Sequence, residues 1–417
     1  MINNLKKKIS QNKASICVIG LGYVGLPLAD AFSQKFKVLG YDLSKKRINQ
    51  LKKNIDINNI NIRAKKIFSS NILFSYDKSE LNKQDIFIIT VPTPINKNNK
   101  PDLTSLDNVF SELLKLDLEK KCIIIESTVY PSLCRKYISI IENKKNFKLN
   151  KNFIFGFSPE RINPGDDKKN IYNISKIISG SSVQATELIN LLYKKIIKKT
   201  HKTNVIEEAE MAKIIENTQR DINIAFINEI SIICDKLNLN FTNVINLAST
   251  KWNFLKFHPG LVGGHCISVD PYYLTHKLNL LNYKPKVILS GRELNENYSN
   301  FIYKRLNKFK FGKTKNKVLI MGLSYKENCN DIRNSKSLDL AKIFLKNKYL
   351  VDLYDPHVKK VHDKNFKLIK KPKKNFYDLI IICVRHKLFF KNNIFFMKYA
   401  GNKNSRIYDV KSAGFFK

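Results

Sequence analysis

Residues 15–25 have the sequence Ser-Ile-Cys-Val-Ile-Gly-Leu-Gly-Tyr-Val-Gly, and this stretch decides the fold of the N-terminal part of the chain. A short apolar run is followed by Gly-x-Gly-x-x-Gly and then by a helical pattern from Leu26 to Gln34. A second apolar run, residues 36–41, ends at Asp42. A strand, a glycine-rich turn, a helix and a second strand closed by an acid are typical of a Rossmann-type dinucleotide-binding unit.

The glycines of this turn let a pyrophosphate approach the helix N-terminus, where backbone N–H groups converge. Asp42 is placed to accept hydrogen bonds from ribose hydroxyls and to repel a 2′-phosphate, which favours NAD over NADP. The basic run 45–47 that follows still leaves room for NADP. The cofactor-binding positions expected in this part of the chain are Gly20, Gly22, Tyr23, Val24, Asp42 and Arg47.

Alternating strands and helices continue to about residue 200. Three further predicted strands, 85–91, 121–125 and 153–157, end in Pro-Thr-Pro, Glu-Ser-Thr and Ser-Pro-Glu. Ligands of an open parallel sheet bind beyond the carboxyl ends of its strands. A single Ser or Thr at a strand end more often caps a helix, but three such ends favour a site. The residues expected to line this crevice are Thr93, Ser127, Thr128 and Glu160.

Residues 205–237 contain neither glycine nor proline, and apolar residues recur at helical spacing. This pattern predicts one long helix, of a length that usually bridges domains or forms a subunit interface. Lys213, Asn217 and Asp221 are spaced i, i+4 and i+8 and therefore share one face. Such a row is usually solvated, but its apolar neighbours also allow Lys213 to point into a cleft.

Cys266 lies in the glycine-rich segment 259–273, Pro-Gly-Leu-Val-Gly-Gly-His-Cys-Ile-Ser-Val-Asp-Pro-Tyr-Tyr. A thiol in a glycine-opened loop, with Asp270 four residues later, is placed like a covalent nucleophile. The alternative is a tight turn in which a small cysteine fits, and these residues alone do not distinguish the two.

A second alternating α/β unit begins near Lys317. The apolar run 318–321 meets Gly322, and the run 349–354 ends at Asp355, but the full glycine fingerprint is missing. We therefore expect no dinucleotide there. Basic residues at strand ends and in loops, namely Lys326, Arg333 and Lys411, could contact a diphosphate or could be ordinary surface charge.

The formal net charge of the 417-residue chain is +39, which raises the possibility of a nucleic-acid or polymer binder. The lysines are spread through every segment, so we favour compositional bias and expect no nucleic-acid or membrane partner. The seven cysteines include no Cys-x-x-Cys pair, which argues against a disulfide framework and a metal site. The first residues lack the apolar stretch of a secretory signal, so a cytoplasmic protein is expected.

Several motifs together resemble the UDP-glucose/GDP-mannose dehydrogenase family. They occur in the family's order from about residue 15 to residue 412: 20–27, 91–94, 126–129, 158–165, Lys213 with Asn217, 263–270, and 325–333. Segments 216–221 and 259–266 are most similar to the UDP-N-acetylhexosamine 6-dehydrogenases of surface polysaccharide synthesis. Among substrates, UDP-N-acetylglucosamine or UDP-N-acetylgalactosamine is thus implied, with UDP-glucose and UDP-N-acetylmannosamine as alternatives.

The resemblance implies an α/β protein with two Rossmann-like domains joined by a long central helix and a helical dimerisation region. Expected domains are 1–200 for NAD, 201–310 for the central helices and the cysteine loop, and 311–417 for the UDP-sugar. A homodimer is expected. The implied reaction oxidises the sugar C6 alcohol to a carboxylate in two steps with two NAD, through a cysteine thiohemiacetal and thioester.

Residue roles follow from the same resemblance. Cys266 would attack the C6 aldehyde, Lys213 and Asn217 would stabilise oxyanions, and Asp270 would manage protons with a bound water. Glu160 would activate the hydrolytic water, and Thr128 would help position it. Further cofactor contacts are assigned to Thr93, Thr128 and Arg333, and substrate contacts to Arg161, Lys213, Asn217, Gly263, Tyr325, Lys326 and Lys411.

The chain departs from the family pattern at three positions. Pro164 stands where UDP-glucose enzymes are expected to have a second Glu, which favours the acetamido branch. His258 replaces an Arg expected before the Pro-Gly-Leu-Val-Gly-Gly segment, and Lys411 stands where many relatives carry Arg. A lysine offers a point charge in place of a bidentate contact.

Overall fold

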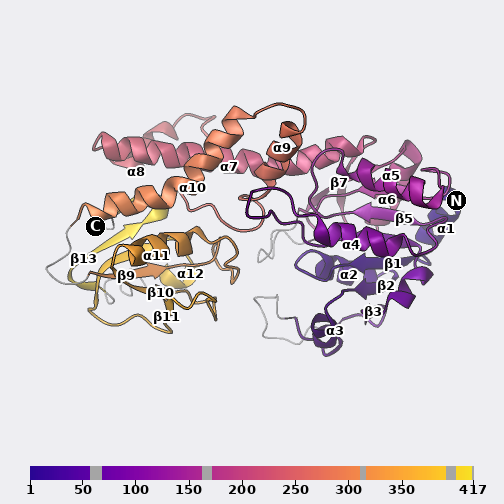
Figure 1. The fold of residues 1–417 in the computed structure, drawn as a ribbon, viewed down its shortest axis with the longest axis horizontal. Coiled ribbons are helices and arrows are strands. Elements are labelled where there is room, and N and C mark those ends of the chain that lie inside the picture. The colour runs from indigo at the N-terminus through magenta and orange to yellow at the C-terminus, as the bar shows by residue number, and fades with distance from the viewer. Residues whose placement is uncertain (57–67, 162–170, 310–315, 391–400, 416–417) are drawn as a thin grey trace. The chain divides into compact units, whose positions relative to one another are not determined.

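The computed structural model describes residues 1–56, 68–161, 171–309, 316–390 and 401–415 (Figure 1). Packing divides the chain into two units. The N-terminal unit comprises Met1–Ile215 with Tyr272–Leu280, and the C-terminal unit comprises Glu216–Pro271 with Leu281–Lys417. The expected three-part division at residues 200 and 310 stays a prediction.

An eight-stranded sheet forms the centre of the N-terminal unit, in the order β3-β2-β1-β4-β5-β6-β7-β8. Its strands are β1 (Ser15–Ile19), β2 (Lys37–Tyr41), β3 (Ile72–Ser75), β4 (Ile86–Ile89), β5 (Cys122–Ile125), β6 (Ile154–Phe157), β7 (Ser175–Gly180) and β8 (Lys199–Thr203). Pairing is parallel except between β6 and β7. Because β1 lies between β2 and β4, the chain changes direction across the sheet at β1, where ligands of such folds bind.

Helices cover both faces of this sheet, because its strands are apolar on both sides. Side chains of α1 (Ile2–Ser10), α2 (Gly25–Ser33) and α6 (Val183–Tyr193) form one core with Ile16 and Val18 of β1. Those of α4 (Thr104–Leu113) and α5 (Leu133–Lys145) form a second core with Cys17 and Ile19. Helix α3 (Lys45–Lys52) follows β2.

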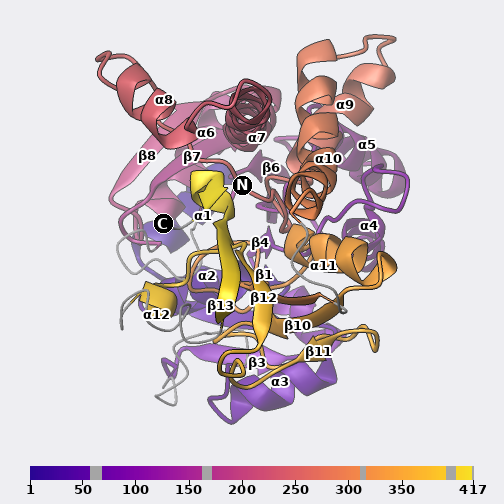
Figure 2. The same ribbon diagram turned by 90° about the vertical axis from the view of Figure 1, so that its left-hand side faces the viewer.

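The sheet of the C-terminal unit has the order β11-β10-β9-β12-β13-β14. Its strands are β9 (Lys317–Met321), β10 (Leu350–Tyr354), β11 (Lys367–Leu368), β12 (Tyr377–Ile382), β13 (Gly401–Asp409) and β14 (Gly414–Phe415). Only β13–β14 is antiparallel among the described pairs. Helices α10 (Lys286–Asn307) and α11 (Lys336–Lys346) pack on one face and α12 (Lys387–Phe390) on the other (Figure 2).

The remaining helices are α7 (Ile206–Lys236), α8 (Phe241–Ala248) and α9 (Asp270–Asn279). Helix α7 is continuous over 31 residues, as its sequence predicted. Within the described ranges, no helix combines the length and the apolar character that crossing a bilayer requires.

The predicted fold class is confirmed: both sheets are mostly parallel and belong to α/β layers. The sequence did not indicate the reversed pairing of β6 and β7, nor the strands β3 and β8. Strand β8 is a largely exposed edge strand with the sequence Lys-Thr-His-Lys-Thr, so it lacks the apolar run by which inner strands are recognised.

Glu210 of α7 caps the start of α5 inside the N-terminal unit. Its carboxylate accepts hydrogen bonds from the backbone N–H groups of Ser132 (2.6 Å) and Cys134 (2.9 Å). Burial raises the pKa of Glu210 to about 7, although these hydrogen bonds act in the opposite direction. The folded state therefore binds a proton more tightly than the unfolded state does.

This raised pKa predicts a pH-dependent stability. The contribution of Glu210 is fully present below about pH 4.5, its unfolded value, and is lost as the pH rises through about 7. Glu210→Gln, which imitates the protonated acid, should flatten the dependence of the unfolding midpoint over this range. Thermal unfolding from pH 4.5 to 8 measures it.

Glu207→Gln is the matched control for that experiment. Burial raises the pKa of Glu207, but hydrogen bonding and charge from Arg135 outweigh it and hold the pKa below its usual value. Its contribution therefore has the opposite sign and is lost as the pH falls. Parallel profiles for the two variants would contradict the assignment to Glu210.

Candidate active site

The glycine turn after β1 is built for a close ligand approach. Gly20 has φ +96°, and its N–H donates to the carbonyl of Tyr41 at 2.8 Å. A Cβ on Gly25 would overlap the carbonyl oxygen of Gly20, so only glycine lets α2 start this close to the turn. A Cβ on Gly22 would meet nothing within 4 Å, because this position faces open space. These features fit a bound pyrophosphate.

Asp42 ties the end of β2 to the same turn. Its Oδ2 accepts from the backbone N–H of Leu21 (2.9 Å), and its Oδ1 accepts from that of Ser44 (2.8 Å). Arg47 is buried; its Nε donates to the carbonyl of Leu21 (3.0 Å) and its Nη2 pairs with Asp56 (2.8 Å). Asp42 is therefore held beside the turn by two backbone hydrogen bonds, and the guanidinium of Arg47 is bonded to a carbonyl of the same turn.

A pocket of about 340 Å³ lies beside Asp42 in the N-terminal unit. It is lined by Gly20, Asp42 and Leu43 at one side and by Val91, Pro92, Asn108 and Val109 at another. Lys78 and Glu112, which the sequence did not single out, form an ion pair of 3.0 Å on its wall. Its size and its mainly apolar lining with few polar groups suit a nucleoside.

The ends of β4 and β5 are brought together as expected. Thr93 Oγ1 donates to the carbonyl of Thr128 (2.9 Å), and Ser127 Oγ donates to that of Val91 (2.7 Å). The hydroxyl of Tyr273 donates to the carbonyl of Thr93 (2.8 Å). These bonds fix the backbone of both strand ends.

Lys213 and Glu160 meet in the N-terminal unit. Lys213 is only 6% exposed; its Nζ donates to the carbonyl of Glu160 (2.8 Å) and lies 3.9 Å from Glu160 Oε2. Arg161 Nη1 donates to the carbonyl of Ser175 on β7 (3.0 Å). The row on α7 is thus buried, and its lysine lies against a carboxylate.

The cysteine loop belongs to the C-terminal unit. Asn217 Nδ2 donates to Asp270 Oδ2 (2.6 Å), and both side chains are buried. The backbone N–H of Asp270 donates to the carbonyl of Cys266 (2.8 Å), which starts α9 directly after the loop. Cys266 is half-buried, whereas every other cysteine is buried. The backbone of Cys266 is therefore bonded to the residue whose carboxylate accepts from Asn217.

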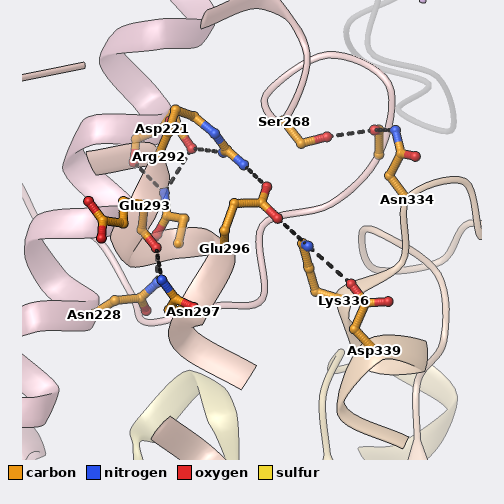
Figure 3. Close-up of polar contacts among 12 residues, drawn as sticks. Asp221, Asn228, Ser268, Arg292, Glu293, Glu296, Asn297, Asn334, Lys336 and Asp339 are labelled. Atoms are coloured by element: carbon orange, nitrogen blue, oxygen red, sulfur yellow. Dashed lines mark hydrogen bonds and ion pairs between the residues drawn. The ribbon is translucent and has the colours of Figure 1, made fainter. Parts of the chain in front are cut away.

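Gly264 anchors this loop to Arg333 and Asn334. Its N–H donates to the carbonyl of Arg333 (3.1 Å), and its own carbonyl accepts from Ser268 Oγ (2.7 Å) and Asn334 Nδ2 (2.8 Å; Figure 3). Gly264 has φ +90°, and a Cβ there would lie 2.7 Å from the ring of Tyr325. A Cβ on Gly263 would overlap the carbonyl of Asn334. Glycine is required at both positions.

Arg333 is held by Asp331, two residues away. The guanidinium donates to both oxygens of Asp331, and its Nη2 lies 3.1 Å from His265 Nδ1. Burial alone would raise the pKa of Asp331, but hydrogen bonds and charge from Arg333 outweigh it and lower the pKa. Tyr325 packs edge-on to His265 at 5.5 Å, and burial raises the pKa of its hydroxyl.

In the C-terminal unit, Lys326 lies in a loop and Lys411 in the short 3-10 helix Val410–Ser412. Lys326 Nζ lies 5.8 Å from the centre of the Tyr325 ring, and Lys411 pairs with Glu327 at 2.8 Å. His258 has its pKa lowered by partial desolvation and then by the charges of Lys411 and Arg385. The two departures from the family pattern, His258 and Lys411, therefore lie within electrostatic range of each other. Pro164 lies outside the described residues.

A chain of polar contacts connects α7, α10 and α11 within the C-terminal unit (Figure 3). Asp221, fully buried, accepts from Arg292 Nη1 at 2.6 Å, and Arg292 also pairs with Glu296. Glu296 pairs in turn with Lys336, which lies 3.0 Å from Asp339. Burial raises the pKa of Asp221, and the charge of Arg292 opposes this shift.

Within each unit the structure brings several predicted residues together, but the sequence missed several of their partners. Asn334, Arg292 and Glu296 were not anticipated, because no local motif relates them to Gly264, Asp221 and Lys336, which lie 70, 71 and 40 positions away. Asp331 was not assigned a role from the sequence. Its spacing from Arg333, i and i+2, was the one available signal for the pair.

Gly25→Ala and Gly22→Ala provide a matched test of the glycine turn. Gly25→Ala should lower the melting temperature of the free protein and weaken NAD binding, because α2 must shift away from Gly20. Gly22→Ala should leave the melting temperature nearly unchanged and weaken only NAD binding. Calorimetry with and without NAD measures both. Equal stabilities of the two variants would contradict this account.

Arg292→Met should destabilise the C-terminal unit by about 3–5 kcal/mol, because it leaves the carboxylate of Asp221 buried without its cation. The double variant Asp221→Asn, Arg292→Met removes both charges and should recover most of that loss. Chemical unfolding followed by fluorescence measures both. A double variant as unstable as the single one would show that packing, not charge, dominates.

The amino-acid sequence and the fold are similar to those of known proteins. Residues 14–197, 207–297 and 319–413 match the NAD binding, central and UDP binding domains of the UDP-glucose/GDP-mannose dehydrogenase family. The chain is 42% identical to UDP-N-acetyl-D-glucosamine 6-dehydrogenase of Salmonella typhi, over 96% of each chain. It is 40% identical to the Pseudomonas aeruginosa protein of that name, over 95% of this chain and 96% of that one.

Among solved structures, the UDP-N-acetylmannosamine dehydrogenase of Pyrococcus horikoshii is similar, with a TM-score of 0.83 and 28% identity over 96% of each chain. The predicted family is thereby confirmed. Sequence, fold and the three domain matches agree: this chain belongs to the UDP-glucose/GDP-mannose dehydrogenase family, and its N-terminal domain is an NAD-binding domain.

Proposed function

We propose that this protein oxidises the C6 alcohol of UDP-N-acetylglucosamine or UDP-N-acetylgalactosamine to the uronate, for surface polysaccharide synthesis. The observation that carries the proposal is the buried Asn217–Asp270 pair next to Cys266. A thiol, an amide donor and a carboxylate are the groups that oxidation through a covalent intermediate needs. The names of the relatives at 40% and 42% identity support the acetamido sugar.

The glycine turn, Asp42 and the adjoining pocket fit NAD. NAD bound there would supply the oxidising power as a hydride acceptor, with one NAD consumed in each of the two successive oxidations. The proposed cofactor contacts are Gly20, Gly22, Tyr23, Val24, Asp42, Arg47, Thr93, Thr128 and Arg333.

Asp270 is proposed as the proton acceptor for the first oxidation, through a bound water. Asn217 donates to its carboxylate and so fixes its direction. The thiolate of Cys266 then adds to the C6 aldehyde, because an aldehyde must become tetrahedral before it can lose a hydride. The second oxidation of this adduct leaves a thioester on Cys266.

The amide of Asn217 and the ammonium of Lys213 are proposed to stabilise the oxyanions of these steps. Glu160 accepts a proton from the water that hydrolyses the thioester, with Thr128 positioning that water. Lys213 lies 3.9 Å from Glu160 Oε2, a separation at which the ammonium favours the ionised carboxylate.

Substrate contacts are proposed for Arg161, Gly263, Tyr325, Lys326 and Lys411, in addition to Lys213 and Asn217. A second candidate substrate is UDP-N-acetylmannosamine, which the similar Pyrococcus horikoshii structure favours. UDP-glucose is the remaining alternative within the family.

We further propose that the protein is a cytoplasmic homodimer assembled through its central helices. Large apolar side chains are exposed there: Phe226 on α7, Leu247 on α8, and Trp252, which is 91% exposed. Exposed apolar residues of this size, close together in sequence, are typical of subunit interfaces. Light scattering should give twice the chain mass.

Purified protein incubated with NAD and each of the four UDP-sugars tests the reaction. Two NADH per UDP-sugar consumed are expected with an N-acetylhexosamine substrate. One NADH per sugar would indicate an alcohol dehydrogenase and would exclude the thioester mechanism.

Cys266→Ala should lower the rate of NADH formation by about a thousandfold or more, because the second oxidation loses its nucleophile. Cys234→Ala is the matched control, since it removes a buried thiol of α7 that has no role in the mechanism. Activity retained by Cys266→Ala would contradict covalent catalysis.

A further inference from the structure

Three buried polar side chains of the N-terminal unit have no role in the mechanism proposed above. Lys176 Nζ on β7 donates to Glu126 Oε2 at 2.6 Å, and the hydroxyl of Tyr193 donates to Glu126 Oε1. Lys176 is 3% exposed and Glu126 is 2% exposed. A buried ion pair rarely stabilises a fold more than apolar residues of similar volume would. Its presence therefore suggests another role.

The segment 158–161, which contains Glu160, is fastened to β7 on both sides of Lys176. Ser158 Oγ donates to the carbonyl of Ile177 (2.7 Å), and Arg161 Nη1 donates to that of Ser175 (3.0 Å). The Lys176 backbone lies between these two acceptors. Lys176 therefore lies in the part of β7 to which both ends of the short segment with Glu160 are hydrogen-bonded.

Glu126 connects the same group to the end of β5. It is the residue immediately before Ser127 and Thr128, and Thr128 is assigned to water positioning. The backbone N–H of Glu126 donates to the carbonyl of Ile89 (2.8 Å), so its position in the sheet is fixed. One buried ion pair therefore supports both segments that the hydrolytic step is proposed to use.

The charges also interact. Burial lowers the pKa of Lys176. The negative charges of Glu126 and Glu160 oppose this shift, whereas the positive charge of Lys213 adds to it. Burial and the charge of Glu126 raise the pKa of Tyr193. Because Coulomb interactions are mutual, the ammonium of Lys176 favours the ionised form of Glu160. The ionisable groups facing Lys176 are Glu126, Glu160, Tyr193 and Lys213.

We infer that Lys176, paired with Glu126 and Tyr193, is a positioning residue for thioester hydrolysis: it holds the segment 158–161, and with it Glu160, in place. This inference rests on the proposed function. In the step concerned, water adds to the thioester carbonyl, the carbon–sulfur bond breaks, and the electron pair leaves with the Cys266 sulfur. One proton of the water passes to Glu160.

Lys176→Met tests the inference by removing the ammonium with little change in side-chain length. Rapid mixing with NAD and the UDP-sugar should show a burst of two NADH per chain followed by a slow phase. The steady-state kcat should fall at least tenfold, with KM changed less. Intact-mass measurement should detect the sugar acyl group on Cys266, because hydrolysis has become rate-limiting.

The dependence of kcat on pH is a second measurement, and a smaller amount of folded protein would not change its midpoints. Its acidic limb should shift upward by roughly one unit in Lys176→Met, because Glu160 loses a nearby cation. Lys202→Met is the matched control, since Lys202 forms an exposed ion pair with Glu187 in the same unit. It should show wild-type kinetics and no acyl adduct.

Lys176→Met leaves Glu126 buried without its cation and can reduce folding. The double variant Glu126→Gln, Lys176→Met removes both charges, and Tyr193→Phe removes only a hydroxyl. Both should show the burst and the adduct, with a smaller pH shift than the single variant.

Wild-type kcat in these folded variants, or a loss of activity without burst or adduct, would overturn the inference. The proposed function fails separately, and the inference with it, if the wild-type protein forms only one NADH per sugar.

Discussion

Helix α7 buries a row of polar side chains, and each of them must be paired because burial without a partner is costly. Within the N-terminal unit, Lys213 is paired with Glu160. Within the C-terminal unit, Asn217 is bonded to Asp270 and Asp221 to Arg292. Within each unit, the requirement to satisfy these groups brings loops from distant parts of the sequence against that unit's part of the helix. The candidate catalytic residues are the same residues that meet this requirement.

The turn after the first strand has a similar hydrogen bond in both sheets, but the acid that accepts this bond has different surroundings in each. In the N-terminal unit, Asp42 accepts from the N–H of Leu21, and its side is open to a pocket. In the C-terminal unit, Asp355 accepts from the N–H of Leu323 in the same manner, but His386 Nε2 also lies 3.0 Å from its carboxylate. His386 thus contacts the carboxylate of Asp355, at the position equivalent to the one where Asp42 is expected to bind a ribose.

Glycine has a different purpose at each site. In the nucleotide turn, Gly22 keeps space open for a ligand, whereas Gly25 allows a helix to start close to a strand. In the cysteine loop, Gly263 and Gly264 remove side chains that would strike Asn334 and Tyr325. The loop is therefore held by backbone hydrogen bonds and close packing, which leaves the half-buried Cys266 in a defined position.

The α/β class, the nucleotide turn with Asp42, the long helix and the unusual loop setting of Cys266 could all be predicted from the amino-acid sequence. These features depend on residues that are close together in the chain. Over such short distances, glycine spacing and apolar periodicity predict the local backbone structure. Only the tertiary structure decided the partners: Glu160 for Lys213, Asp270 for Asn217, Asn334 for Gly264, and Glu126 with Tyr193 for Lys176. Such pairs form because buried charges and donors need partners, and sheet order, which no local pattern encodes, determines which partners are within reach.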